Sequence, residues 1–129
     1  MKSFLVLSLI ILSTVCALAQ NSIIHVIENN AGFSINVKQE DKLILSIITS
    51  GTCVNKGDQF HIAFTDGTDL DLTNGSNKNS LCMALIYLDN NYAKILSSKT
   101  VKSICLQTSA GKMERAFNKS QAAEFKKLF

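Results

Sequence analysis

Residues 59–73 read QFHIAFTDGTDLDLT, two alternating runs of apolar and more polar residues around a central turn. Alternation with a period of two residues is typical of a β-strand that has one buried face. The Asp66-Gly67 pair between the runs is a common turn sequence in β-hairpins. The stretch therefore predicts an antiparallel hairpin, and the residues of its buried face are Phe60, Ile62, Phe64, Leu70 and Leu72.

The register of this hairpin depends on the length of its loop. A two-residue loop would set Phe64 opposite Asp69, an aromatic ring beside a carboxylate. A three-residue loop over residues 65–67 pairs apolar residues with one another and ends on a glycine, where the chain needs a left-handed residue. Hydrophobic pairing favours the second register, which places His61 opposite Asp71 on the outer surface. Its pairs are Phe64–Thr68, Ile62–Leu70 and Phe60–Leu72.

Further β-strand patterns lie on both sides of the hairpin. Leu43–Thr49 is a nearly continuous apolar run rich in Ile, which predicts a central strand or one buried on both faces. After the polar residues 89–91 the period changes, and Tyr92–Leu96 fits one or two helical turns. The remaining strand patterns cover residues 23–27, 33–37, 83–88, 101–108 and 112–117.

The chain ends with a predicted amphipathic helix. Asn118 is a favourable N-cap, and Gln121 three residues later completes a capping box. Ala122, Phe125 and Phe129 follow at helical spacing and form its apolar face. The sequence therefore predicts a mainly β (α+β) fold, an antiparallel β-roll or small barrel of about seven strands with this helix packed on it. The order of elements resembles pleckstrin-homology-like domains, a likeness that implies no function.

The N-terminal segment has the three parts of a signal peptide. Lys2 is followed by the apolar run FLVLSLIIL at residues 4–12 and then by small residues ending at Ala19. The run is shorter than the roughly 20 apolar residues that span a bilayer. We expect cleavage after Ala19, a single β-rich domain over residues 20–129, no stable membrane span after cleavage, and a secreted, periplasmic or cell-envelope location.

Charge argues against nucleic-acid binding. Removing Lys2 from the 13 basic residues leaves 12 against 10 acidic ones, a net charge of +2. The basic residues are scattered along the sequence, whereas binding to nucleic acid or to anionic lipid needs them clustered. The sequence also contains no glycine-rich phosphate loop, so we expect no cofactor.

Three cysteines remain after signal cleavage, because Cys16 leaves with the signal. Cys53 begins one polar turn and Cys82 follows another, whereas Cys105 lies inside a strand pattern. In an oxidising compartment we expect a Cys53–Cys82 disulfide and one remaining thiol. A buried thiol is the favoured interpretation of Cys105, and a lone nucleophile is the alternative, although no histidine is near it in sequence.

Asp66, Asp69 and Asp71 form the densest carboxylate cluster. An EF-hand starting at Asp69 fails because residues 74 and 80 are not the required Gly and Glu. His61 with Asp69 or Asp71 is a weak zinc candidate, since these residues offer only two or three ligands without Cys. The alternative is a solvated strand face with a His–Asp pair. No motif indicates a catalytic residue.

Several short segments together resemble small exported proteins of the Bacteroidota that have no assigned function. These segments are Cys53–Gln59, Phe64–Thr68, Leu70–Leu72, Cys82, Lys102–Ile104 and Asn118–Phe129. The resemblance implies a periplasmic, surface or secreted location and implies no reaction. The sequence as a whole favours a non-enzymatic module that binds a protein or small-molecule ligand through strand edges or loops. The alternative is a metal-dependent protein or hydrolase that uses His61 with Asp69 and Asp71.

Overall fold

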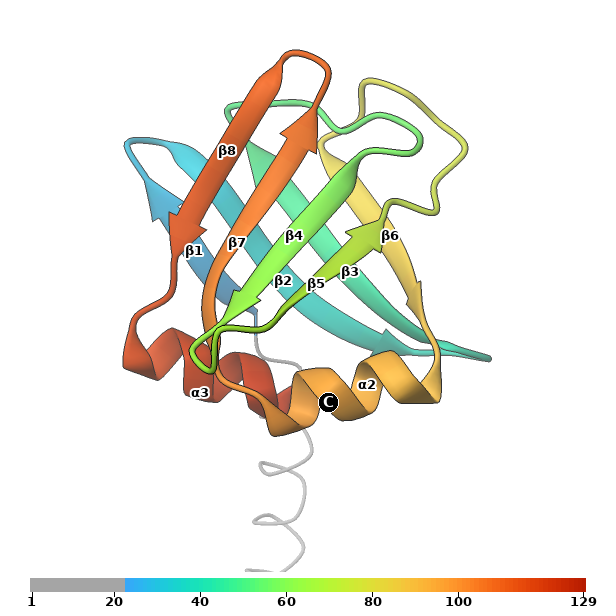
Figure 1. The fold of residues 1–129 in the computed structure, drawn as a ribbon. Coiled ribbons are helices and arrows are strands. Elements are labelled where there is room, and N and C mark those ends of the chain that lie inside the picture. Colours follow the sequence, from blue (N-terminus) through green and yellow to red (C-terminus); the bar gives the residue numbers. More distant parts are fainter. Residues whose placement is uncertain (1–22) are drawn as a thin grey trace, which may run out of the picture.

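The computed structural model describes residues 23–129, which form eight β-strands and two α-helices. The predicted signal peptide, residues 1–19, lies outside the described residues. Figure 1 shows the strands in two layers, with both helices at one end. The elements are β1 (Ile24–Glu28), β2 (Ala31–Gln39), β3 (Leu43–Ser50), β4 (Gln59–Phe64), β5 (Asp69–Thr73), β6 (Met83–Leu88), α2 (Asn90–Ser98), β7 (Val101–Thr108), β8 (Gly111–Ala116) and α3 (Lys119–Lys127).

The strands form two four-stranded antiparallel sheets, with the orders β1-β2-β3-β6 and β5-β4-β7-β8. The predicted mainly β, α+β class with a C-terminal helix is confirmed, with one strand more than the seven expected. Within residues 23–129 the sheets do not close into a barrel. The edge of β6 pairs instead with a loop, since Leu85 N–H donates to Asn74 Oδ1 (3.2 Å) and Gly75 N–H donates to Leu85 O (2.8 Å).

The β4–β5 hairpin has the predicted register. Phe60 lies opposite Leu72 and Ile62 opposite Leu70, and Phe64 N–H donates to Thr68 O at 2.9 Å. The turn contains Gly67, whose φ of 86° is costly for any residue with a Cβ atom. Hydrophobic pairing thus selected the three-residue loop, as expected.

The core fills the space between the two sheets. Phe33 of β2 and Phe60 of β4 are fully buried and meet edge to face, with ring centroids 5.9 Å apart. The predicted central strand, β3, lies between β2 and β6. Its burial on both faces is only partial, because Ile44 is buried on the outer face and Ile48 is 45% exposed there.

Both predicted helices are present. The capping box of α3 forms as predicted, since the Asn118 carboxamide accepts from the Gln121 backbone and the Gln121 side chain accepts from the Asn118 backbone. Helix α2 begins at Asn90, earlier than the pattern indicated, because the Asp89 side chain caps it by accepting from Tyr92 N–H at 2.8 Å. Neither helix of residues 23–129 has the length and apolarity that a bilayer crossing requires.

The predicted disulfide is not formed in this structure. All three cysteines of residues 23–129 are free, with Cys53 and Cys82 exposed and Cys105 buried. Two hydrogen bonds, which Val54 and Leu81 exchange at 2.7 and 3.1 Å, hold the two loops together in place of a covalent bond. Cys53 precedes Val54 and Cys82 follows Leu81, so this antiparallel bridge brings the backbones of the two cysteines near one another.

Phe125 packs the C-terminal helix onto the sheets. Its side chain is 1% exposed and contacts Phe117 and Phe129 edge to face, with centroids 5.6 and 5.1 Å apart. We expect Phe125→Ala to lower the free energy of unfolding by about 3–5 kcal/mol, because it leaves a cavity. Urea denaturation measures the change, and Tyr87→Ala is the matched control, since Tyr87 is 51% exposed. Equal losses in the two variants would contradict the packing described here.

Candidate functional site

The structure brings His61, Asp69 and Asp71 together on the outer face of the β4–β5 hairpin. The Nδ1 atom of His61 lies 2.7 Å from Asp71 Oδ1, and its Nε2 atom lies 3.4 Å from Asp69 Oδ2. The predicted pairing of His61 with Asp71 is confirmed. Each ring nitrogen therefore has a carboxylate beside it.

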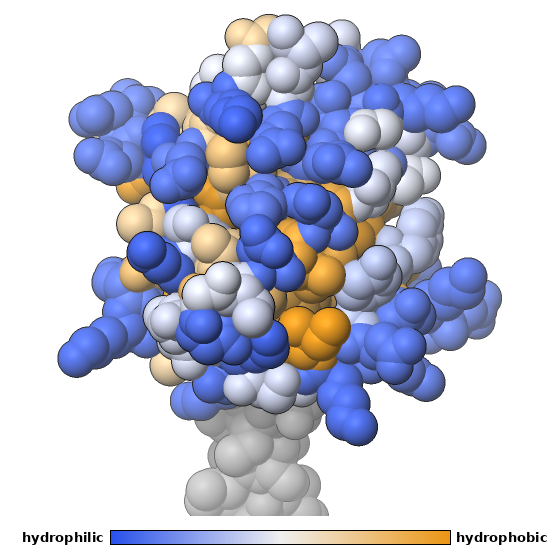
Figure 2. Space-filling model, viewed as in Figure 1, coloured by the Kyte–Doolittle hydropathy of each residue, from blue (hydrophilic) through white to orange (hydrophobic). Residues whose placement is uncertain are grey.

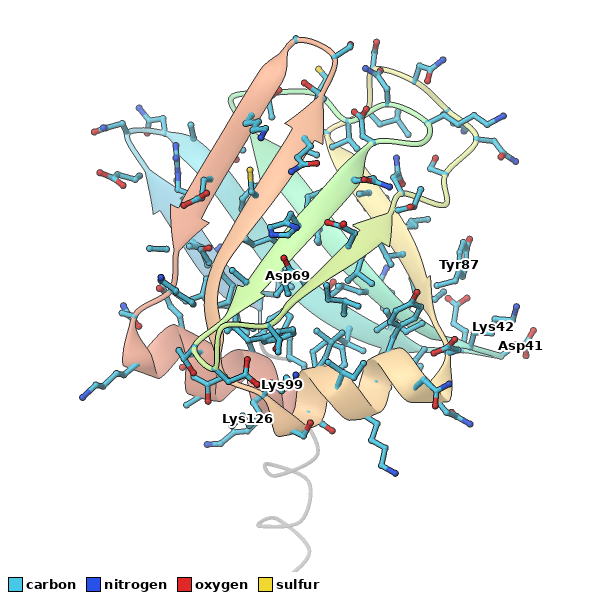
Figure 3. The ribbon with its side chains drawn as sticks, viewed as in Figure 1. Asp41, Lys42, Asp69, Tyr87, Lys99 and Lys126 are labelled. Atoms are coloured by element: carbon cyan, nitrogen blue, oxygen red, sulfur yellow. The ribbon has the colours of Figure 1, made fainter. Side chains whose placement is uncertain are left out.

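This group lies on an open surface. The side chains of His61, Asp69 and Asp71 are 31%, 66% and 55% exposed. Figure 3 shows Asp69 on the front of the sheet, and Figure 2 shows this view of the molecule as mostly hydrophilic, with hydrophobic surface near its middle and above α2. An exposed pair of this kind contributes less than about 1 kcal/mol to stability.

Sheet pairing extends the group to two residues that sequence reasoning did not connect with it. Cys105 of β7 lies directly opposite His61, and Glu114 of β8 lies directly opposite Cys105. With Asp71 these residues form one row across four strands, on the face away from the core. The alternation of β7 already indicated that Cys105 faces away from Ile104, but no local signal shows that β4 and β7 are neighbours.

The surroundings of Cys105 do not activate its thiol. The residue is 5% exposed, and burial, followed by the negative charge of Glu114, raises the pKa of the thiol. A raised pKa lowers the fraction of thiolate, which is the nucleophilic form. This environment is typical of a buried structural cysteine, and it disfavours the alternative of a lone nucleophile.

The carboxylate cluster seen in the sequence is divided in the structure. Asp66 lies apart from the histidine and accepts from the Thr68 backbone N–H at 2.9 Å, while Lys99 Nζ is 3.3 Å from its other oxygen. Across residues 23–129, no set of three or more His, Cys, Asp or Glu side chains has an arrangement that could hold a metal ion.

A second candidate surface covers the outer side of β3 and β6. Ile44 pairs with Tyr87 and Ile48 pairs with Met83, and these side chains point away from the core. Leu85 on β6 lies between them, opposite the buried Ser46 of β3. We call this surface the β3–β6 face, and its residues are Ile44, Ile48, Met83, Leu85 and Tyr87. Three of them are strongly exposed, with Ile48 at 45%, Met83 at 37% and Tyr87 at 51%.

Tyr87 separates two clefts at the end of the β3–β6 face. One cleft, of about 450 Å³, lies towards α2, and the other, of about 340 Å³, lies towards Ile44. Both are also bordered by Asp41 and Lys42 of the β2–β3 turn, and Figure 3 shows Tyr87 projecting from β6 above this turn. Gly75 makes room for the ring, because a Cβ atom there would lie 2.8 Å from it. The face therefore combines exposed apolar side chains with a polar rim at the end beside Tyr87.

Comparison of the chain with protein-family models, with curated proteins and with solved structures finds no match. The two surfaces described above are therefore the basis for assigning a function.

Hydrogen bonds from the Thr68 hydroxyl and the Thr68 N–H, assisted by Lys99, lower the pKa of Asp66 from its ordinary 3.8 to about 2. We expect Thr68→Val to raise this pKa towards its ordinary value, and Lys99→Ala to raise it less. An NMR titration of the Asp66 carboxyl carbon measures both shifts. Because the folded-state pKa is lowered, the stability that these contacts add is complete above about pH 4 and is lost as the pH falls towards 2. A titration midpoint near pH 4 for the Asp66 carboxyl in the unchanged protein would contradict this geometry.

Proposed function

We propose that this chain is an exported, non-enzymatic binding module that takes a protein partner on its β3–β6 face. The observation that carries the proposal is Tyr87, which is half exposed beside two clefts and lies on the same face of β3 and β6 as the exposed residues Ile48 and Met83. Contiguous exposed apolar side chains mark interaction sites on soluble proteins. Tyr and Met are among the residues enriched at protein interfaces.

The surroundings of the face favour a protein over a small ligand. Both clefts beside Tyr87 are open, and their rim carries charges of both signs from Glu40, Asp41, Lys42 and Asp89. An apolar centre with a polar rim is the usual anatomy of a protein–protein interface. Small-molecule sites are more enclosed and bury most of the ligand surface.

The proposed location outside the cytoplasm comes from the N-terminal sequence, with Lys2, the apolar run at residues 4–12 and a cleavage site after Ala19. In an oxidising compartment the free, exposed thiols of Cys53 and Cys82 are the pair suited to form a disulfide, since the Val54–Leu81 bridge holds their backbones together. Cys105 would remain as a buried thiol.

A second candidate function is a metal-dependent protein or hydrolase that uses His61, Asp69 and Asp71. It is supported by their proximity, because Asp71 at Nδ1 could orient the ring while Nε2 and the Asp69 carboxylate face one another. Two ligands are fewer than zinc usually takes from a protein. This function is therefore the weaker of the two.

Site-specific photo-crosslinking tests the binding surface. A photoreactive phenylalanine at position 87, in the cells that produce the protein, should give one discrete adduct with another protein. The same residue at position 73, which is exposed on β5 in the other sheet, should not. Met83→Asp should lower the yield at position 87 by at least about tenfold, since a buried carboxylate without a partner costs more than the roughly 1.4 kcal/mol to which a factor of ten corresponds.

Two results would overturn this function. Equal labelling from positions 87 and 73 would remove the case for a specific face. A stoichiometric divalent metal in the purified protein that is lost in His61→Ala would favour the metal-dependent alternative.

Thiol counting on unreduced, signal-cleaved protein tests the disulfide. We expect one free thiol per denatured chain, and a peptide map should link the fragments that contain Cys53 and Cys82. Cys105→Ser should keep this link, and Cys82→Ser should abolish it. Closing this loop should stabilise the fold by about 3–4 kcal/mol in the chain-entropy model. Three free thiols in the cleaved chain would show that the bond does not form.

A further inference from the structure

A cleft rimmed by lysines lies on α3, at the end of the molecule where the two helices gather. Its volume is about 390 Å³. Figure 3 shows Lys126 at this end, close to Lys99. The spacing of its α3 residues places them on one side of the helix. The cleft is lined by Thr100, Lys119, Ala122, Ala123, Lys126 and Lys127.

The three lysines of this rim outnumber Glu124, the one acidic residue of α3. In the described part of the chain, no carboxylate forms an ion pair with Lys119, Lys126 or Lys127. Lys126 Nζ donates instead to the Thr100 hydroxyl at 3.1 Å. Lys99, by contrast, is 3.3 Å from an oxygen of Asp66. The rim is thus a local concentration of positive charge, although the whole chain is nearly balanced.

The position of Lys119 is unfavourable for the helix itself. It occupies the first turn of α3, where the positive end of the helix dipole repels a cation, and no acidic residue in that turn offsets it. Lys126 and Lys127, in the last turn, are placed favourably. Helix stability therefore accounts for two of the three charges, and Lys119 calls for another explanation.

The floor of the cleft is apolar. Ala122 is 4% exposed and Ala123 is exposed beside it, so their methyl groups and the methylene stems of the lysines line the space. Lysine side chains of this kind keep their ammonium groups in water while their stems cover apolar surface. A matching ligand has negative charge at its surface and apolar groups close beneath it.

The chain enters the described structure at the same end. Gln121 of α3 donates from Nε2 to the carbonyl of His25 in β1 at 2.9 Å. Eleven residues, 13–23, separate the apolar run 4–12 from β1. Even when fully extended they reach at most about 40 Å. Until cleavage after Ala19, insertion of that run in a membrane would hold the start of β1, and the adjoining part of α3, within about this distance of the bilayer surface.

We propose that the lysine-rimmed cleft of α3 binds the headgroup layer of an anionic phospholipid membrane. The lysines contact lipid phosphates, and the alanine floor accepts the glycerol region beneath them. The contact is peripheral, and each lysine near such a surface should strengthen binding about fivefold. It uses a different surface from the β3–β6 face, so the two proposals can fail separately.

Vesicle co-sedimentation of the full chain tests this contact. Because the apolar run can itself enter any bilayer, the quantity compared is partitioning into phosphatidylglycerol-containing vesicles relative to phosphatidylcholine vesicles. We expect this ratio to fall about tenfold or more in Lys119→Glu/Lys127→Glu, and to fall as salt is raised. The melting temperature of this variant should change little, since Lys119→Glu improves the helix dipole interaction and Lys127→Glu weakens it by a similar amount.

The matched control is Lys56→Glu/Lys78→Glu, which makes the same change of charge elsewhere in the molecule. Lys56 lies in the loop before β4, and Lys78 lies in the loop after β5. An equal loss of the ratio in this control would overturn the proposal, because net charge alone would then explain it. A ratio of one for the unchanged protein would also overturn it. Stronger binding to a soluble sulfated polysaccharide than to the vesicles would assign the cleft to anionic polymers instead.

Discussion

The pairing of apolar side chains across the β4–β5 hairpin determines both its buried face and its polar face. Phe60 opposite Leu72 and Ile62 opposite Leu70 direct these side chains into the core. The same register makes His61 and Asp71 neighbours outside. Because side chains alternate along a strand, a slip of one residue would exchange the two faces. Core burial and the polar group are therefore two results of one constraint.

The features that could be predicted from the sequence depend on residues close together in the chain. The hairpin register needs only 15 residues, and the α3 capping box needs only Asn118 and Gln121. The amphipathic face of α3 follows from the same short range, since Ala122 and Phe125 are buried as the spacing indicated. In each case the local geometry admits few alternatives.

The features that could not be predicted depend on which segments meet. Cys105 lies opposite His61 only because β4 pairs with β7, and neither strand carries a sequence signal for its partner. The run at Leu43–Thr49 is apolar on both faces, so the sequence does not show that Ile48 stays exposed. The outer face of β3 is buried at Ile44 and Ser46 and exposed at Ile48, a difference that depends on neighbouring segments and not on the run itself. The disulfide was inferred from loop positions, but the loops are joined in this structure by hydrogen bonds of Val54 and Leu81.

Withdrawal of Cys105 from solvent affects how the chain can mature. An unfolded chain with Cys53, Cys82 and Cys105 can be oxidised to any of three pairings. In the folded molecule only two of these thiols are exposed, and the third has a raised pKa that slows thiol–disulfide exchange. Folding before oxidation therefore leaves a single intramolecular product, whereas oxidation before folding can trap a mispaired chain. If the chain is oxidised, the order of these two events decides whether Cys53 and Cys82 are the pair that reacts.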